Sequence, residues 1–118
     1  MDPLASGAPD LAGHVERLAR RLRSMSEVRL ARPLPGHASR ADAARALAQQ
    51  LADAAARLEG LPLRPVPRLH DLAVGDQVAV TGSDLAAAAA AAGAVRGADV
   101  RAALDHACLA CRELAAAL

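Results

Sequence analysis

Apolar residues recur at alternating spacings of three and four along four segments of the chain, which is the period of an amphipathic α-helix. The first segment begins at Asp10, a residue suited to capping a helix N-terminus, and its stripe ends at Met25. The second begins at Ser39, where Ser39 and Asp42 are spaced as in a capping box with Asp in place of Glu, and ends at Gly60. The two stripes are Leu11, Val15, Leu18, Leu22 and Met25, then Ala44, Leu47, Leu51, Ala54 or Ala55, and Leu58.

The third segment has two interpretations. Val78 and Val80 favour a strand from Gln77 to Thr81, whereas an unbroken apolar stripe favours one helix from about Leu72 to Ala92. A single strand with no partner elsewhere would leave its backbone groups unpaired, so we predict the helix. The stripe consists of Val74, Val78, Thr81, Leu85, Ala88 and Ala92.

Two glycines, Gly75 and Gly82, lie seven residues apart in this predicted helix and therefore on one side of it. Each costs about 1 kcal/mol relative to alanine. Either they are simply tolerated, or they allow the backbone of a neighbouring helix to approach closely.

The fourth segment runs from Ala98 or Asp99 to the C-terminus, with Val100, Leu104, Ala107, Cys111, Leu114 and Leu118 as its stripe. The connection before it, "GAVRG", is short, so we expect the third and fourth helices to be antiparallel neighbours. The two earlier connections are long. The first, "SEVRLARPLPGHA", has room for an extra turn near residues 27–30, and the second, "LPLRPVPRLH", is rich in proline.

The proline-rich connection is long enough to change the order of the helices. Ten residues in polyproline II form span roughly 30 Å, the length of a 20-residue helix. It can therefore run the full height of a bundle, and an up-down-up-down order does not follow. We predict an all-α, four-helix bundle-like single domain over residues 10–118, preceded by a flexible tail over residues 1–9.

The composition narrows the possible functions. The 118 residues include 33 alanines, no aromatic residue and no lysine, and the net charge is +1. All-arginine basic residues are typical of a GC-rich genome, and the near-neutral charge gives no bulk attraction to nucleic acid or membrane. Residues 1–9 lack the basic and apolar regions of a signal peptide, so we expect a cytoplasmic protein that does not enter a membrane.

The segment "HACLAC", His106–Cys111, carries both cysteines of the chain. Cys108 and Cys111 are three residues apart on the fourth predicted helix, so their sulfurs are neighbours, whereas His106 lies near the opposite, solvated face. Two thiolates can form half of a tetrahedral zinc site or a linear Cu(I) pair. Reduced cysteine is also a common small core residue, and we favour that interpretation and expect no cofactor. The metal site at Cys108, Cys111 and His106 is kept as the alternative.

The segment "CLACREL" resembles part of a helix in the bacterial copper-storage four-helix bundles, whose interiors are lined by CxxC and CxxxC pairs. The resemblance covers about seven residues. Those proteins carry cysteines on several helices, whereas this chain has two on one. The resemblance therefore implies at most one low-capacity site per chain, or one shared across a dimer.

A basic segment gives a third hypothesis. Residues 16–32 carry six arginines and two glutamates, and this Arg17–Arg32 face would contact phosphates in a DNA-associated protein. "SRADAARALAQQLADAA" begins like the first helix of a helix-turn-helix, but no turn and second helix follow it. We expect a solvated helix face instead.

No catalytic signature is present: the sequence lacks G-x-S-x-G, a P-loop, H-E-x-x-H and E-x-x-H. Several apolar residues lie outside the stripes, and those that do not cover the bundle ends should form an apolar patch of the kind that marks an interface. We therefore predict a non-enzymatic interaction module that forms a homodimer or binds another protein. The off-stripe residues are Leu30, Leu34, Leu61, Leu63, Val66, Leu69 and Leu109.

Overall fold

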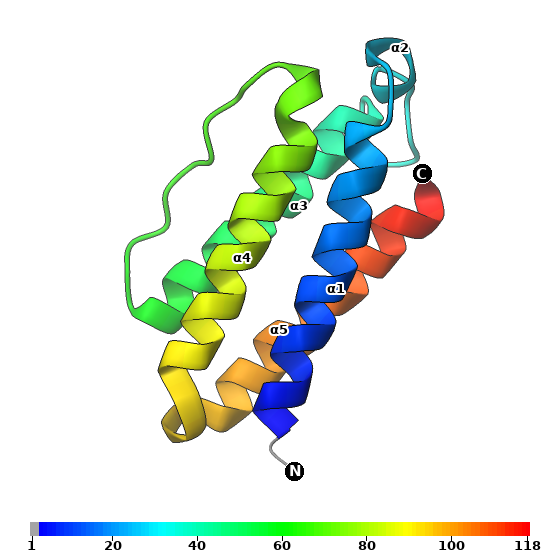
Figure 1. Cartoon of the computed structure of the whole chain (residues 1–118). Helices are drawn as coiled ribbons and strands as arrows, with labels where there is room; N and C mark the ends of the chain where they lie inside the picture. Colours follow the sequence, from blue (N-terminus) through cyan, green and yellow to red (C-terminus); the bar gives the residue numbers. More distant parts are fainter. Residues whose placement is uncertain (1–2) are drawn as a thin grey trace.

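The computed structural model describes residues 3–118, with side chains from Gly7 onward, and contains four long helices joined by short helical turns and extended segments (Figure 1). No strand is assigned among these residues, so the all-α prediction is confirmed. The elements are α1 (Pro3–Arg23), α2 (Glu27–Leu30), α3 (Arg40–Glu59), η1 (Asp71–Ala73), α4 (Val74–Ala92), η2 (Gly93–Arg96) and α5 (Gly97–Ala117).

The first helix begins seven residues earlier than predicted. α1 starts at Pro3 and continues through Pro9, so Asp10 is an interior residue rather than the N-cap, and residues 3–9 are helical rather than a tail. Packing explains the extension. Ala8 lies against the core, and a Cβ on Gly7 would be 3.0 Å from Leu104 Cδ1, so this turn contacts α5.

The caps of α3 are those the sequence predicts. The Ser39 hydroxyl accepts a hydrogen bond from the backbone N–H of Asp42, and Gly60 ends the helix with a left-handed φ of 68°. The capping box is only half formed, because the Asp42 carboxylate binds the guanidinium of Arg45 at 2.8 Å instead of the backbone of Ser39. The extra turn predicted near residues 27–30 is α2, which Ser26 caps.

The ambiguous third segment is a helix. Residues 77–81 lie inside α4, and the Thr81 hydroxyl donates to the carbonyl oxygen of Gln77 within it. The stripe predicted for this helix is its buried face, apart from the partly buried Ala92 at its end.

The two glycines of α4 allow α1 to pack closely. A Cβ on Gly82 would lie 2.6 Å from Cγ1 of Val15, and a Cβ on Gly75 would lie 3.0 Å from the carbonyl oxygen of Ala19. Both distances are too short for an ordinary contact. The predicted close approach of a neighbouring backbone is therefore confirmed at Gly75, whereas at Gly82 the close neighbour is the Val15 side chain.

The helices occupy four corners, with α1 and α3 on one diagonal and α4 and α5 on the other. α1 and α5 run in one direction, and α3 and α4 run in the other (Figure 1). α4 and α5 are antiparallel as predicted, but they are not close neighbours: α5 packs mainly on α1 and less closely on α3. The prediction failed because the η2 turn, which begins at Gly93 with φ 59°, carries the chain across the end of the bundle.

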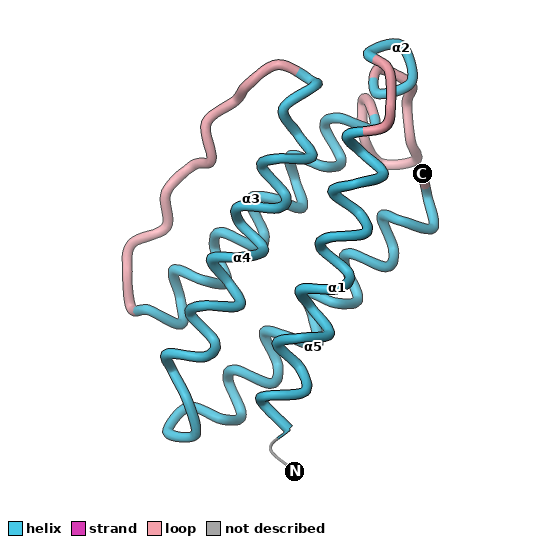
Figure 2. The backbone as a smooth tube through the Cα atoms, viewed as in Figure 1, coloured by secondary structure: helices cyan, strands magenta, loops and turns pink. Residues whose placement is uncertain are grey.

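The proline-rich connection runs the height of the bundle and makes α3 and α4 parallel (Figure 2). Both helices hold it. The Gln49 amide donates to the carbonyl oxygen of Arg64 and accepts from the N–H of Val66, and Gln77 donates to Pro67. The side chains supply the backbone partners that a neighbouring strand would otherwise provide.

The core contains leucine, valine, alanine, Met25 and Cys111, and it contains no aromatic side chain. The stretch from Asp71 to Ala117 includes an 18-residue window with mean hydropathy 1.5, long and apolar enough to cross a membrane, of which 33% is buried here. Core helices of globular proteins have the same composition, so this observation is weak evidence for membrane insertion. The chain folds as one helical bundle.

Candidate functional site

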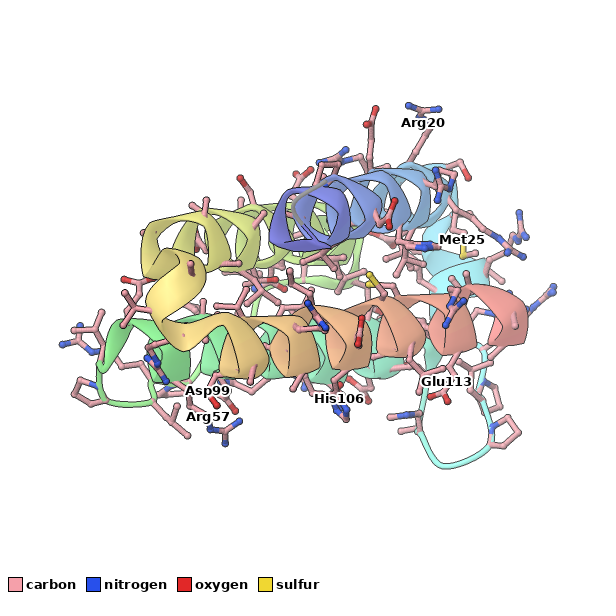
Figure 3. All side chains as sticks on the ribbon, turned by 90° about the horizontal axis from the view of Figure 1, so that it is seen from below. Arg20, Met25, Arg57, Asp99, His106 and Glu113 are labelled. Atoms are coloured by element: carbon pink, nitrogen blue, oxygen red, sulfur yellow. The ribbon has the colours of Figure 1, made fainter. Side chains whose placement is uncertain are left out.

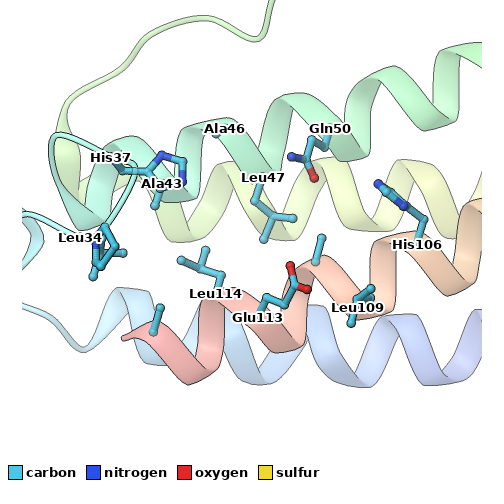
Figure 4. Close-up of a pocket in the computed structure, with 13 residues that line it drawn as sticks. Leu34, His37, Ala43, Ala46, Leu47, Gln50, His106, Leu109, Glu113 and Leu114 are labelled. Carbon is cyan, nitrogen blue, oxygen red and sulfur yellow. The ribbon is translucent and has the colours of Figure 1, made fainter.

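An apolar groove follows the seam between α3 and α5. Two adjoining hollows of about 360 and 490 Å³ lie along it, and Gln50 and His106 line both. Figure 4 shows the smaller of the two. The seam is open because α5 packs less closely on α3 than on α1. We call this feature the α3–α5 groove.

The polar side chains of the groove lie in two rows, one on each helix, and are spaced seven residues apart within each row. Gln50 and Arg57 lie on α3, whereas Asp99, His106 and Glu113 lie on α5. Seven residues rise about 10.5 Å along a helix and return to nearly the same side. The two helices are antiparallel, so Arg57 and Asp99 share one end of the groove, and Glu113 lies at the other (Figure 3).

Small and apolar side chains line the groove between these polar groups. Leu109 projects beside them with 46% of its surface exposed. The apolar lining residues on the two helices are Ala43, Ala46, Leu47, Leu51, Ala54, Leu58, Ala102, Ala103, Ala107, Leu109, Ala110, Leu114 and Ala117.

The two ends of the groove differ in charge. One end holds Arg57, Arg96 and Asp99, a formal charge of +1, and the other holds Glu113, a formal charge of −1 with His37 neutral. Arg96 joins the two helices at the positive end: it donates to the carbonyl oxygen of Leu58 at 2.7 Å and lies 3.4 Å from the Asp99 carboxylate.

The structure gives the three residues of the candidate metal site different surroundings. Cys111 is buried, Cys108 is half-buried, and His106 is exposed and faces the α3–α5 groove. Burial raises the pKa of the Cys111 thiol to about 11 and also raises the pKa of Cys108. Without a metal, both thiols are therefore held in the protonated form near neutral pH, and a metal ion would have to displace both protons. No group of three His, Cys, Asp or Glu side chains among the described residues could hold a metal ion.

Four of the six arginines in the Arg17–Arg32 face bind other groups of this chain, Arg17 through a contact of 3.3 Å with Nδ1 of His14. Arg20 forms an ion pair with Glu16 at 2.8 Å, and Arg23 forms one with Asp76 at 2.6 Å. Arg21 donates to the carbonyl oxygen of Ala115 at the end of α5. This part of the surface therefore carries less uncompensated charge than the sequence suggests.

The apolar residues outside the stripes divide into buried and exposed ones. Leu30 is buried, and Leu34 and Val66 are partly buried. The remaining four are exposed, three of them on the proline-rich connection and one in the α3–α5 groove. These four are Leu61, Leu63, Leu69 and Leu109.

Comparisons of this chain with protein-family models, with curated proteins and with solved structures found no match.

Of the residues that line this groove, His106 and Leu109 stand out in the sequence, whereas Gln50, Arg57, Asp99 and Glu113 do not. A signal for them was present, since polar residues recur every seven positions among alanines in both helices. This spacing indicates a shared groove only when α3 and α5 are known to be neighbours. The lengths of the connections did not indicate that they are.

Proposed function

We propose that the chain is a non-enzymatic helical interaction module that forms a homodimer through the α3–α5 groove. The observation that carries this proposal is the open, alanine-lined seam with Leu109 exposed beside it. An apolar surface bordered by polar side chains is typical of a protein interface.

The small side chains of the groove favour a helix as the occupant. Alanine allows helix axes to approach to about 8 Å, so Leu109 of one copy can enter the groove of the other. The face formed by two helices of about 30 Å has a projected area on the order of 600 Å². That approaches the roughly 800 Å² that each partner buries in a stable complex.

The charges favour a second copy in one orientation. A two-fold axis perpendicular to the helices places the negative end of one groove against the positive end of the other, so Glu113 lies near Arg57 of the second copy. A two-fold axis parallel to the helices would place groove ends of like charge against each other, and the two copies would repel each other. Charge complementarity of this kind selects orientation more than it adds affinity.

Sedimentation velocity with two matched variants tests the proposal. Leu109→Glu places a charge in the groove, whereas Val80→Glu places the same charge on α4, where Val80 is 59% exposed. Both positions are at the surface, so both variants should fold, and circular dichroism checks this. We expect a dimer for the native chain and Val80→Glu and a monomer for Leu109→Glu. A native chain that stays monomeric, or equal behaviour of the two variants, would overturn the proposal.

A further inference from the structure

A separate hollow of about 280 Å³ lies between α5 and α1, away from the α3–α5 groove. Its walls carry His14, Arg17 and Arg21 from α1 and Arg112 from α5, and its floor includes Leu18 and the buried Cys111. The three α1 residues share one side of that helix because they are spaced by three and four. Basic groups from two helices therefore converge on one small space.

No carboxylate lines this hollow, so its formal charge is +3 with His14 neutral. The nearby arginines Arg20 and Arg23, by contrast, each have a carboxylate partner, Glu16 and Asp76. The α1 arginines are thus divided: those that point away from the hollow are paired with acids, and those at the hollow are not.

The hydrogen bonds of these side chains leave donors available. Arg17 Nη2 lies 3.3 Å from Nδ1 of His14, and because arginine only donates, Nδ1 is the acceptor of this hydrogen bond. Arg21 uses Nη1 to bind the carbonyl oxygen of Ala115 at 2.8 Å and keeps its other N–H groups. The side chain of Arg112 makes no hydrogen bond or ion pair with the described part of the chain.

We propose that this hollow is a binding site for a phosphate group, either free or as a phosphate monoester. Guanidinium forks bind phosphate through charge-assisted hydrogen bonds. A tetrahedral dianion presents oxygens toward both helices at once, whereas a planar carboxylate presents two oxygens in one plane. The hollow is small enough for a phosphate group, and its apolar floor can contact a short organic substituent.

Binding of inorganic phosphate and of phenyl phosphate to the full chain tests the site. Nuclear magnetic resonance of the arginine Nε–Hε groups at low salt reports which guanidiniums respond, and calorimetry gives the dissociation constants. The two ligands separate a free-phosphate site from one that prefers a monoester. Arg112→Gln removes one wall of the site, and Arg101→Gln removes the same charge from an exposed position on α5 outside the hollow.

We expect saturable binding with one ligand per chain, and shifts of the Arg17, Arg21 and Arg112 signals. Arg112→Gln should weaken binding on the order of tenfold, as expected for loss of a charge-assisted hydrogen bond, and Arg101→Gln should change it little. Absence of saturation, or equal weakening by both variants, would overturn the proposal. The proposal would also be overturned if duplex DNA bound through these arginines and free phosphate did not compete with it. The Leu109→Glu variant should bind phosphate normally, because its substitution lies in the other groove.

Discussion

Substitution of Gly82 by alanine tests the close packing of α1 on α4, on which the arrangement of the bundle depends. In an exposed helix this change stabilises a protein by about 1 kcal/mol. Here the new Cβ would lie 2.6 and 2.7 Å from the two methyl groups of Val15 and 3.1 Å from its Cβ. A β-branched residue in a helix has one preferred rotamer, so Val15 cannot rotate away and α1 must move outward.

The free energy of unfolding should therefore fall. Overpacking of a core costs about 1–3 kcal/mol, and the contact with both methyl groups places this case near the upper end. After the gain in helix propensity is subtracted, Gly82→Ala should destabilise the protein by about 2 kcal/mol.

Two further variants isolate the cause. Gly97 lies at the start of α5 with a helical φ of −52°, and a Cβ there would meet no atom within 4 Å. Gly97→Ala should therefore stabilise the protein by up to about 1 kcal/mol. In the double variant Val15→Ala with Gly82→Ala, the new methyl group occupies vacated space. The two changes should then be coupled by about 2 kcal/mol.

Urea unfolding followed by circular dichroism measures these free energies. The close packing of α1 on α4 would be wrong if Gly82→Ala stabilised the protein as much as Gly97→Ala. It would also be wrong if the effects of Val15→Ala and Gly82→Ala on the free energy of unfolding were additive in the double variant.

Three other predictions concern the connection, the cysteines and the acid response. Gln49→Ala removes the two hydrogen bonds that Gln49 makes with the proline-rich connection and should lower the free energy of unfolding, measured in urea, by about 1–2 kcal/mol. It should also speed proteolysis of residues 61–70, and an unchanged cleavage rate would contradict this role of Gln49. Because burial raises the pKa of Cys111 to about 11, iodoacetamide at pH 8 should leave Cys111 unmodified until urea unfolds the chain. Cys108, which is half-buried, should react slowly. Equal rates of modification of the two thiols in the native protein, measured by mass spectrometry, would count against this packing. The hydrogen bond from Arg45 lowers the pKa of the Asp42 carboxyl below its ordinary value of 3.8. The stability that Asp42 contributes is therefore present above pH 3.8 and is lost as the pH falls below that value. Asp42→Asn should flatten that part of the curve of stability against pH, and an unaltered curve would exclude the contribution.

The helices could be predicted because their information is local. The three-four spacing of apolar residues located α3, α4 and α5, and Ser39 and Gly60 marked the ends of α3. The start of α1 could not be predicted, because residues 3–9 resemble a tail by composition and become helical where Gly7 and Ala8 meet the rest of the fold.

The position of the candidate site could not be predicted, because it depends on which helices are neighbours. The short "GAVRG" connection suggested that α4 and α5 pack together, yet the η2 turn sends α5 to the opposite corner, beside α1 and α3. The groove and the phosphate-binding hollow both follow from that placement. Only the exposed Leu109 and His106 pointed to the groove from the sequence.

The most direct test of the proposed dimer is a charge exchange between Arg57 and Glu113, measured by sedimentation equilibrium. Arg57 lies at the same end of the groove as Asp99, and Asp99 precedes Glu113 on α5 by 14 residues, a rise of about 21 Å, so Arg57 and Glu113 can interact only between two copies. Arg57→Glu and Glu113→Arg should each weaken the dimer about tenfold, since each variant replaces two attractive rim pairs with repulsive ones. The double variant should restore the native dissociation constant. A double variant no tighter than the two single ones, or a native chain that is monomeric at every concentration, would contradict the account.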